Sequence, residues 1–207
     1  MYSQFGALCS ESALCQAWNE VKTKGSAGGV DGITIEQFSK NKISQIKLIR
    51  EELMAGEWKP QPYLQIAVPK RKDPKEKRIL GMSVIKDKIV QQAIRHIIEP
   101  RLEKIFLPNS YAYRRGKGAL KTIKHIVRQC GCQEYQYALR LDVDNFFDEI
   151  DHTILQQRLT AIGIESDIIR LIMLSVKMGR VEVSFSRFIG SVLFETSSRK
   201  RRRLSKA

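Results

Sequence analysis

The sequence predicts an α+β fold in which helices pack on short antiparallel strands. Apolar residues recur at helical spacing in several segments, most regularly over residues 84–99. Apolar and polar residues instead alternate over residues 64–68 and 135–143, a period typical of half-buried strands. A charged turn at 71–77 separates the first alternating run from Arg78-Ile79-Leu80, and this arrangement predicts an antiparallel hairpin.

Start and stop residues bound the expected helices. Gly25 ends the first helix, and Thr34 followed by Gln37 forms a capping-box pattern that opens a short second one. Pro100 is expected to break the helix over 84–99, because proline lacks an N–H and clashes with the preceding turn. It could then be the first residue of a short helical continuation through Phe106. The first helix is expected over residues 11–24, and the other helices over residues 41–55, 118–130, 152–161 and 166–178.

The balance of charges is strongly basic. The 207 residues contain 36 Lys and Arg against 22 Asp and Glu, a formal net charge of +14. Such a charge predicts a polyanionic partner, and it favours nucleic acid over an anionic membrane surface. The sequence contains no uncharged apolar run long enough to span a bilayer, and residues 1–10 lack a signal-peptide pattern. We therefore expect no membrane partner and a cytoplasmic location. The four cysteines show no C-x-x-C pair, which favours reduced thiols over a zinc site.

An acidic segment follows the second alternating run. Asp142 and Asp144 fall on the face opposite Leu141 and Val143, so the predicted strand ends with carboxylates on its non-core face. Carboxylates at a strand end suit a hard cation such as Mg²⁺. The alternative is that these aspartates are solvated turn and cap residues, and Asp148 or Asp151 is placed to cap the next helix.

Two stretches combine cations with features that suit nucleic acid. The hairpin tip carries six cations against Asp73 and Glu76, and the loop at 108–118 mixes aromatic, basic and glycine residues. Such a loop suits stacking on bases and contact with phosphates, although a charge run is also typical of a solvated face. The cations of the tip are Lys70, Arg71, Lys72, Lys75, Lys77 and Arg78.

These pieces, in this order, resemble the N-terminal half of reverse transcriptases of the bacterial group II intron and retron type. The resemblance covers roughly residues 20 to 180, and the ordered set of blocks is more specific than any one of them. The matching blocks are Gly28-Gly29-Val30-Asp31-Gly32, Val68-Pro69-Lys70, Arg78-Ile79-Leu80-Gly81, Asp87 to Ala93, Ser110 to Arg114 with Gly118-Ala119, and Asp142 to His152.

The resemblance implies a role for each matching residue. Asp142 would be the catalytic ligand of Mg²⁺, or of Mn²⁺ in its place, with the Val143 carbonyl nearby. Phe146 would lie under the sugar of the incoming deoxynucleotide, and Lys70 and Arg78 would hold its triphosphate. The nucleic-acid contacts would come from Lys72, Lys75, Lys77, Tyr111, Tyr113, Arg114 and Arg115.

The sequence also departs from the family pattern. Met82-Ser83 follows Gly81 where an apolar residue and proline are usual, and no Pro-Gln-Gly block follows residue 180. The family completes its metal site with an adjacent pair of aspartates, and no Asp-Asp pair occurs in these 207 residues. A two-metal site needs several carboxylates. Asp144 or Asp148 could substitute, but both are more simply explained as turn or cap residues.

Three functions follow as hypotheses. The first is a truncated or frame-disrupted RNA-directed DNA polymerase that binds template RNA, DNA primer and dNTP but is inactive alone, so whether the chain is an enzyme stays open. The second is a non-catalytic, maturase-like fragment that binds RNA, including intron RNA. An unrelated metal nuclease has little support, because the three histidines are scattered and only one acidic cluster exists. The oligomeric state does not follow from the sequence.

The expected domain organisation follows the same resemblance. Residues 1–133 would form a helical N-terminal region and fingers with the basic hairpin, and residues 134–196 an incomplete palm. Residues 197–207 would be a basic, disordered tail.

Overall fold

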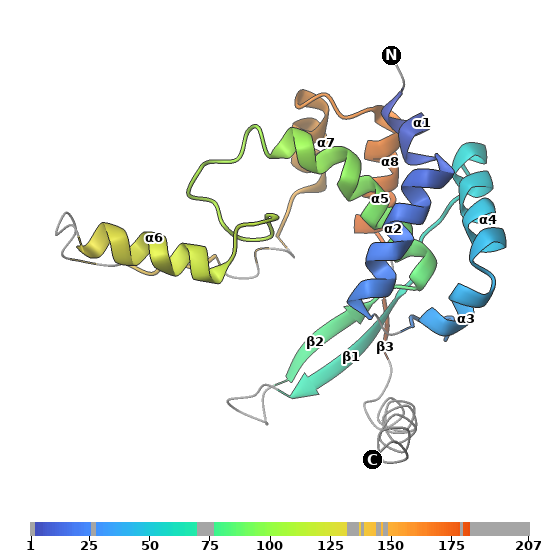
Figure 1. Cartoon of the computed structure of the whole chain (residues 1–207), viewed down its shortest axis with the longest axis horizontal. Coiled ribbons are helices and arrows are strands. Elements are labelled where there is room, and N and C mark those ends of the chain that lie inside the picture. The colour runs from blue at the N-terminus through green and yellow to red at the C-terminus, as the bar shows by residue number, and fades with distance from the viewer. Residues whose placement is uncertain are drawn as a thin grey trace, which may run out of the picture. The chain divides into compact units, whose positions relative to one another are not determined.

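The computed structural model describes residues 3–25, 28–69, 77–131, 137, 139–143, 146, 149–178 and 180–182. They belong to two compact units, one made of Met1–Ile97 with Ile164–Ala207 and the other of Ile98–Gly163. Figure 1 labels the elements in chain order. These are α1 (Gln4–Leu8), α2 (Glu11–Lys24), α3 (Ile35–Lys40), α4 (Lys42–Ala55), β1 (Tyr63–Pro69), β2 (Lys77–Met82), α5 (Ile85–Leu102), α6 (Ala119–Gly131), α7 (His152–Ala161), α8 (Ser166–Val176) and β3 (Arg180–Glu182).

The helix ends of the first unit follow the predicted capping chemistry. The Ser10 hydroxyl accepts a hydrogen bond from the Ala13 N–H at the start of α2, and Gly25 ends that helix in the left-handed conformation. At α3, the Thr34 side chain accepts from the Gln37 N–H while the Gln37 side chain accepts from the Thr34 N–H. The predicted capping box is therefore confirmed.

The sheet belongs to the first unit and contains the predicted hairpin. β1 and β2 pair antiparallel, with Leu64 opposite Met82 and Pro69 opposite Lys77. β3 adds a short parallel pairing on the other side of β1, so the strand order is β2-β1-β3 (Figure 1). The mixed helix-and-strand fold class and its antiparallel pair are thereby confirmed.

The core of the first unit lies mainly among its helices. Trp18 of α2 and Phe38 of α3 are buried, and their ring centroids lie 4.6 Å apart. Ile66 is the buried residue that β1 contributes. Glu165 joins α8 to α1 by accepting hydrogen bonds from the N–H groups of Gln4 and Phe5 at 2.7 and 2.9 Å. The helical part of this unit is thus packed and capped independently of the outer end of the hairpin.

The structure corrects the expected break at Pro100. This residue lies inside α5, which continues to Leu102, and the Glu103 N–H still donates to the Glu99 carbonyl at 2.9 Å. Pro100 stands in the last turn of the helix, where the N–H that it lacks removes a single intrahelical bond. The ring therefore does not end the helix.

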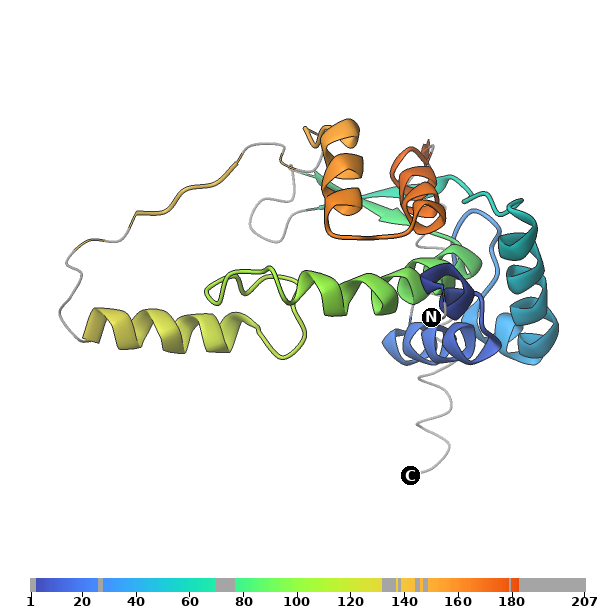
Figure 2. The same cartoon turned by 90° about the horizontal axis from the view of Figure 1, so that it is seen from above.

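The second unit holds the loop after α5, then α6 and α7 (Figure 2). Helix α6 was predicted correctly, but none of its described residues is buried, and Leu120 and Val127 are 77% and 64% exposed. The predicted strand over 135–143 is wrong for the residues that are described there, because 137 and 139–143 have no regular secondary structure. Their apolar side chains are open to solvent, with Leu141 82% exposed. Alternation alone does not make a strand without a partner for its backbone.

No described helix is both long and apolar enough to cross a membrane.

Candidate nucleic-acid and nucleotide site

The hairpin end is the first part of the candidate site. Lys77 begins β2 opposite Pro69, and its side chain is exposed. Arg78 follows in β2, opposite Val68. Lys70, Lys72 and Lys75 lie outside the described residues, as does the turn that contains them. The structure therefore places Lys77 at the end of the hairpin next to residues 70–76, and it places the backbone of Arg78 one residue further along β2.

The glycine-rich loop lies against the segment that joins β2 to α5. A Cβ atom at Gly29 would lie 2.5 Å from the Val84 nitrogen and 2.7 Å from its Cα, so this backbone approach excludes any side chain. The loop is further held by the Gly32 N–H, which donates to the Gly29 carbonyl, and by the Ile33 N–H, which donates to Asp31. Gly29 thus sets the direction in which the hairpin leads into α5.

Asp87 is a buried carboxylate that the sequence reasoning did not single out. It is 1% exposed, and its Oδ2 accepts from the Gln61 N–H at 2.8 Å, while Oδ1 is buried with no hydrogen-bond partner among the described residues. Burial raises the pKa of Asp87 to about 6, against the opposing effects of the Gln61 N–H and of Lys86. The sequence could have predicted this burial, because Asp87 precedes Val90 and Ile94 by three and seven residues and so lies on the same apolar face of the helix.

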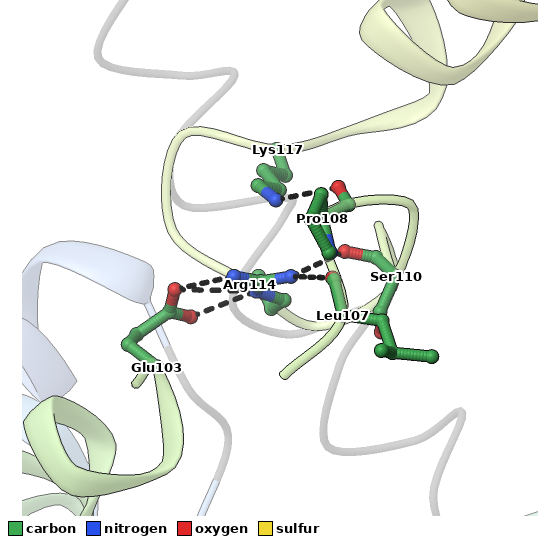
Figure 3. A network of polar contacts seen from close by, with 6 residues as sticks. All are labelled: Glu103, Leu107, Pro108, Ser110, Arg114 and Lys117. Atoms are coloured by element: carbon green, nitrogen blue, oxygen red, sulfur yellow. Dashed lines mark hydrogen bonds and ion pairs between the residues drawn. The ribbon is translucent and has the colours of Figure 1, made fainter. Parts of the chain in front are cut away.

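The aromatic-basic loop is organised by Arg114 (Figure 3). Its guanidinium binds both carboxylate oxygens of Glu103, with a shortest distance of 2.7 Å, and donates to the carbonyls of Leu107 and Ser110 at 2.8 Å. It also lies over the Phe106 ring, 5.2 Å from the centroid. The hydrogen bond from Arg114 lowers the pKa of Glu103, and in return Glu103 raises the pKa of Arg114. The Arg114 side chain is 7% exposed, and its hydrogen bonds connect Glu103 to the backbone of the loop.

The other residues of this loop that were predicted to contact nucleic acid are Tyr111, Tyr113 and Arg115. Tyr113 is 89% exposed and has a left-handed backbone with φ of 58°. Tyr111 lies beside His125, with ring centroids 5.8 Å apart, and the Lys117 ammonium is 5.7 Å from its ring. Arg115 is exposed. The loop therefore presents aromatic faces and cations together, which is the combination that binds single-stranded nucleic acid.

The acidic segment is open to solvent where it is described. Asp142 is exposed, and its Oδ1 accepts from the Val143 N–H at 3.1 Å. Val143 is 66% and Phe146 53% exposed. Asp151 caps α7 by accepting from the N–H groups of Thr153 and Ile154, and these bonds lower its pKa. Of the two predicted caps, Asp151 is confirmed, whereas Asp148, like Asp144, lies outside the described residues.

These residues fit a metal site in part. Asp142 offers an accessible carboxylate of the kind that Mg²⁺ prefers. Within the described ranges no group of three His, Cys, Asp or Glu side chains could hold a metal ion.

Comparison with known proteins connects the hairpin and the acidic segment with one protein family. The family model for reverse transcriptase (RNA-dependent DNA polymerase) matches residues 68–196, from the hairpin through the acidic segment. Protein YkfC of Escherichia coli K12 is 26% identical over 77% of this chain and 42% of its own length.

Two intron-encoded proteins are similar as well. The group II intron-encoded protein LtrA of Lactococcus lactis is 32% identical over 63% of this chain and 21% of its own length. A putative COX1/OXI3 intron 1 protein of Saccharomyces cerevisiae is 23% identical over 82% of this chain. The chain thus spans between 20% and 42% of the length of these relatives. Because the family model covers more than half of the sequence, this chain belongs to the reverse transcriptase family.

Proposed function

We propose that this chain forms the fingers and the first part of the palm of an RNA-directed DNA polymerase of the group II intron type, and that it binds template RNA and an incoming dNTP. The observation that carries the proposal is the family match over residues 68–196, which includes the basic cations of the hairpin tip, β2 and Asp142. The net charge of +14 supports a nucleic-acid partner.

In this proposal the hairpin binds the phosphates. Lys70 supplies a point charge to the triphosphate, and Arg78 supplies a fork of donors. Phe146 favours a deoxyribose by leaving no room for a 2′-hydroxyl. Asp142 and the Val143 carbonyl would hold Mg²⁺, or Mn²⁺ in its place, and such a metal would supply positive charge to the phosphates.

The template and the DNA primer contact the remaining cations and the aromatic loop. The hydrogen bonds of Arg114 to Glu103 and to two carbonyls support a positioning role for this residue, in addition to any direct contact. The side chains proposed to touch nucleic acid are those of Lys72, Lys75, Lys77, Tyr111, Tyr113, Arg114 and Arg115.

Chemistry by this chain alone is not expected. No Asp-Asp pair occurs in its 207 residues, so the second pair of carboxylates would have to come from elsewhere. The same observation favours a second candidate function, maturase-like binding of intron RNA without DNA synthesis. The similarity to a group II intron-encoded protein is consistent with this alternative.

A primer-extension assay on a homopolymer RNA template with Mg²⁺ tests the proposal. We expect RNA binding by the chain without primer extension. Incorporation of dNTP by the purified chain would show that the site is complete. A chain that does not bind RNA at all would contradict both candidate functions.

A further inference from the structure

A pocket of about 300 Å³ lies in the first unit, apart from the residues proposed for the polymerase site. Three of the residues that line it are cations, two carry amides, and none of them is acidic. They are Val21, Lys24, Lys88, Gln91, Gln92 and Arg95. Its volume is at the lower end of the range for ligand pockets, which suits a small group rather than a large organic molecule.

The pocket follows from the spacing of residues on two helices. Lys88, Gln91, Gln92 and Arg95 recur at intervals of three, one and three residues, so they share one face of α5. Lys24 is the last residue of α2. The apolar residues Ile89, Val90 and Ala93 of α5 are buried instead.

Hydrogen bonds hold the wall of the pocket. The Lys24 ammonium donates to the Gln92 Oε1 at 3.2 Å, and the Gln92 Nε2 donates to Glu20 at 2.8 Å. Glu20 also pairs with His96 at 2.9 Å. Gln92 is 9% exposed, so its amide is fixed with its oxygen toward Lys24. The carboxylate of Glu20 is thereby bound to Gln92 and His96.

Two cations of the pocket, Lys88 and Arg95, are partly removed from water. Lys88 is half-buried, and burial lowers the pKa of its ammonium although Asp31 acts in the opposite direction. The attraction between a cation and an anion is stronger where burial lowers the effective dielectric constant than at an exposed position. An anion that enters this pocket would therefore interact with at least one cation at reduced dielectric, and Gln91 could donate its amide N–H.

We infer that this pocket binds a backbone phosphate of a single-stranded nucleic acid, at a contact separate from the hairpin and the acidic segment. The inference rests on the proposed function for the nature of the partner. Three cations and the Gln91 amide suit a phosphodiester, which carries one negative charge and several acceptor oxygens. Lys24 is exposed at the rim, so a continuous strand can reach the pocket without having an end there.

The test uses variants of the full chain. Lys24→Gln with Arg95→Gln removes two positive charges from the pocket, whereas Lys40→Gln with Lys47→Gln removes two from exposed positions on α3 and α4. Affinity for a short single-stranded RNA is measured by fluorescence anisotropy at several salt concentrations, after melting curves have shown that both variants fold.

We expect the pocket variant to bind RNA about tenfold more weakly than the control variant. The salt dependence of its affinity should fall by about 0.7 in log–log slope for each phosphate that the variant no longer binds. Equal affinity and equal slope for the two variants would overturn the inference.

A third variant, Lys77→Gln with Arg78→Gln, separates this inference from the proposed function. A loss of affinity in the hairpin variant alone would support the proposed function and overturn the pocket contact. A loss in the pocket variant alone would support the pocket contact and contradict the contacts proposed for Lys77 and Arg78. Inorganic phosphate supplies a further arm. Phosphate could raise the melting temperature of the unaltered chain but not of the pocket variant, while both bind RNA with equal affinity. That result would show that the pocket binds a small anion and that the inferred contact with a nucleic-acid strand is wrong.

Discussion

Gly29 and Asp87 show how single residues determine the connection between the hairpin and α5. Gly29 brings the glycine-rich loop against the backbone of Val84, just before α5 begins. Asp87, in the first turn of that helix, accepts a hydrogen bond from the backbone of Gln61, just before β1. One residue thus acts through the absence of a side chain and the other through a buried charge.

Replacement of Gly29 by alanine should destabilise the protein. The new Cβ would lie 2.5 Å from a backbone nitrogen that cannot turn aside as a side chain would, so we expect a loss of roughly 1–3 kcal/mol in unfolding free energy. Urea unfolding measures it. Gly118→Ala is the control, because that glycine has open space around it. Equal stability of the two variants would contradict the close approach.

Asp87 should make stability depend on pH in an identifiable range. Its folded-state pKa is raised from 3.8 to about 6, so the folded state holds the proton more tightly than the unfolded chain does. Stability from this group is therefore fully present below about pH 4 and is lost as pH rises through about 6.

Asp87→Asn removes that titration. Between about pH 4 and pH 7 the unaltered protein should lose about 2–3 kcal/mol more unfolding free energy than the variant does. Urea unfolding at several pH values measures both profiles. Parallel profiles would show that the Asp87 carboxylate is not shielded from water.

At the scale of elements, the loop between α5 and α6 depends on one side chain. Arg114 connects Glu103, at one end of the loop, to the carbonyls of Leu107 and Ser110. Because several donors converge from one planar group, a shorter neutral side chain cannot replace them.

Arg114→Gln should therefore open the loop. We expect trypsin to cleave after Arg115 and Lys117 about ten times faster than in the unaltered chain, because cleavage follows the population of open conformations. Mass spectrometry identifies the cut sites. Arg128→Gln, on the exposed surface of α6, removes the same charge and should leave the cleavage rate unchanged. If both variants are cut at the same rate, the Arg114 contacts do not hold the loop.

The sequence was most informative where local chemistry decides the structure. The helix over 11–24, the capping box at Thr34 and the hairpin around Val68 depend on nearby residues, and all three were predicted correctly. The alternation over 135–143 failed for the described residues because a strand depends on a partner that the pattern does not specify. The pocket cations were missed although their spacing on α5 was visible, since only the structure brings Lys24 of α2 beside them.

For the whole molecule, the family membership was predictable because ordered blocks extend over most of the chain, and the family model matches residues 68–196. The roles of Lys70, Asp142 and Phe146 stay predictions. Lys70 lies outside the described residues, and among the described residues no group of three His, Cys, Asp or Glu side chains could hold a metal ion. The net charge of +14 belongs to the chain as a whole and predicts its behaviour toward RNA without reference to any one site.

The salt dependence of RNA affinity tests the central proposal most directly, namely that this chain is a part of a polymerase that binds nucleic acid. Cation contacts release counterions from phosphates, so about five contacts predict a log–log slope of about −3 to −4 and a loss of about 100-fold between roughly 50 and 200 mM salt. A short single-stranded RNA and the full chain suffice for the titration. A steep slope in this range is the expected result, and an affinity that does not change with salt would contradict the proposal.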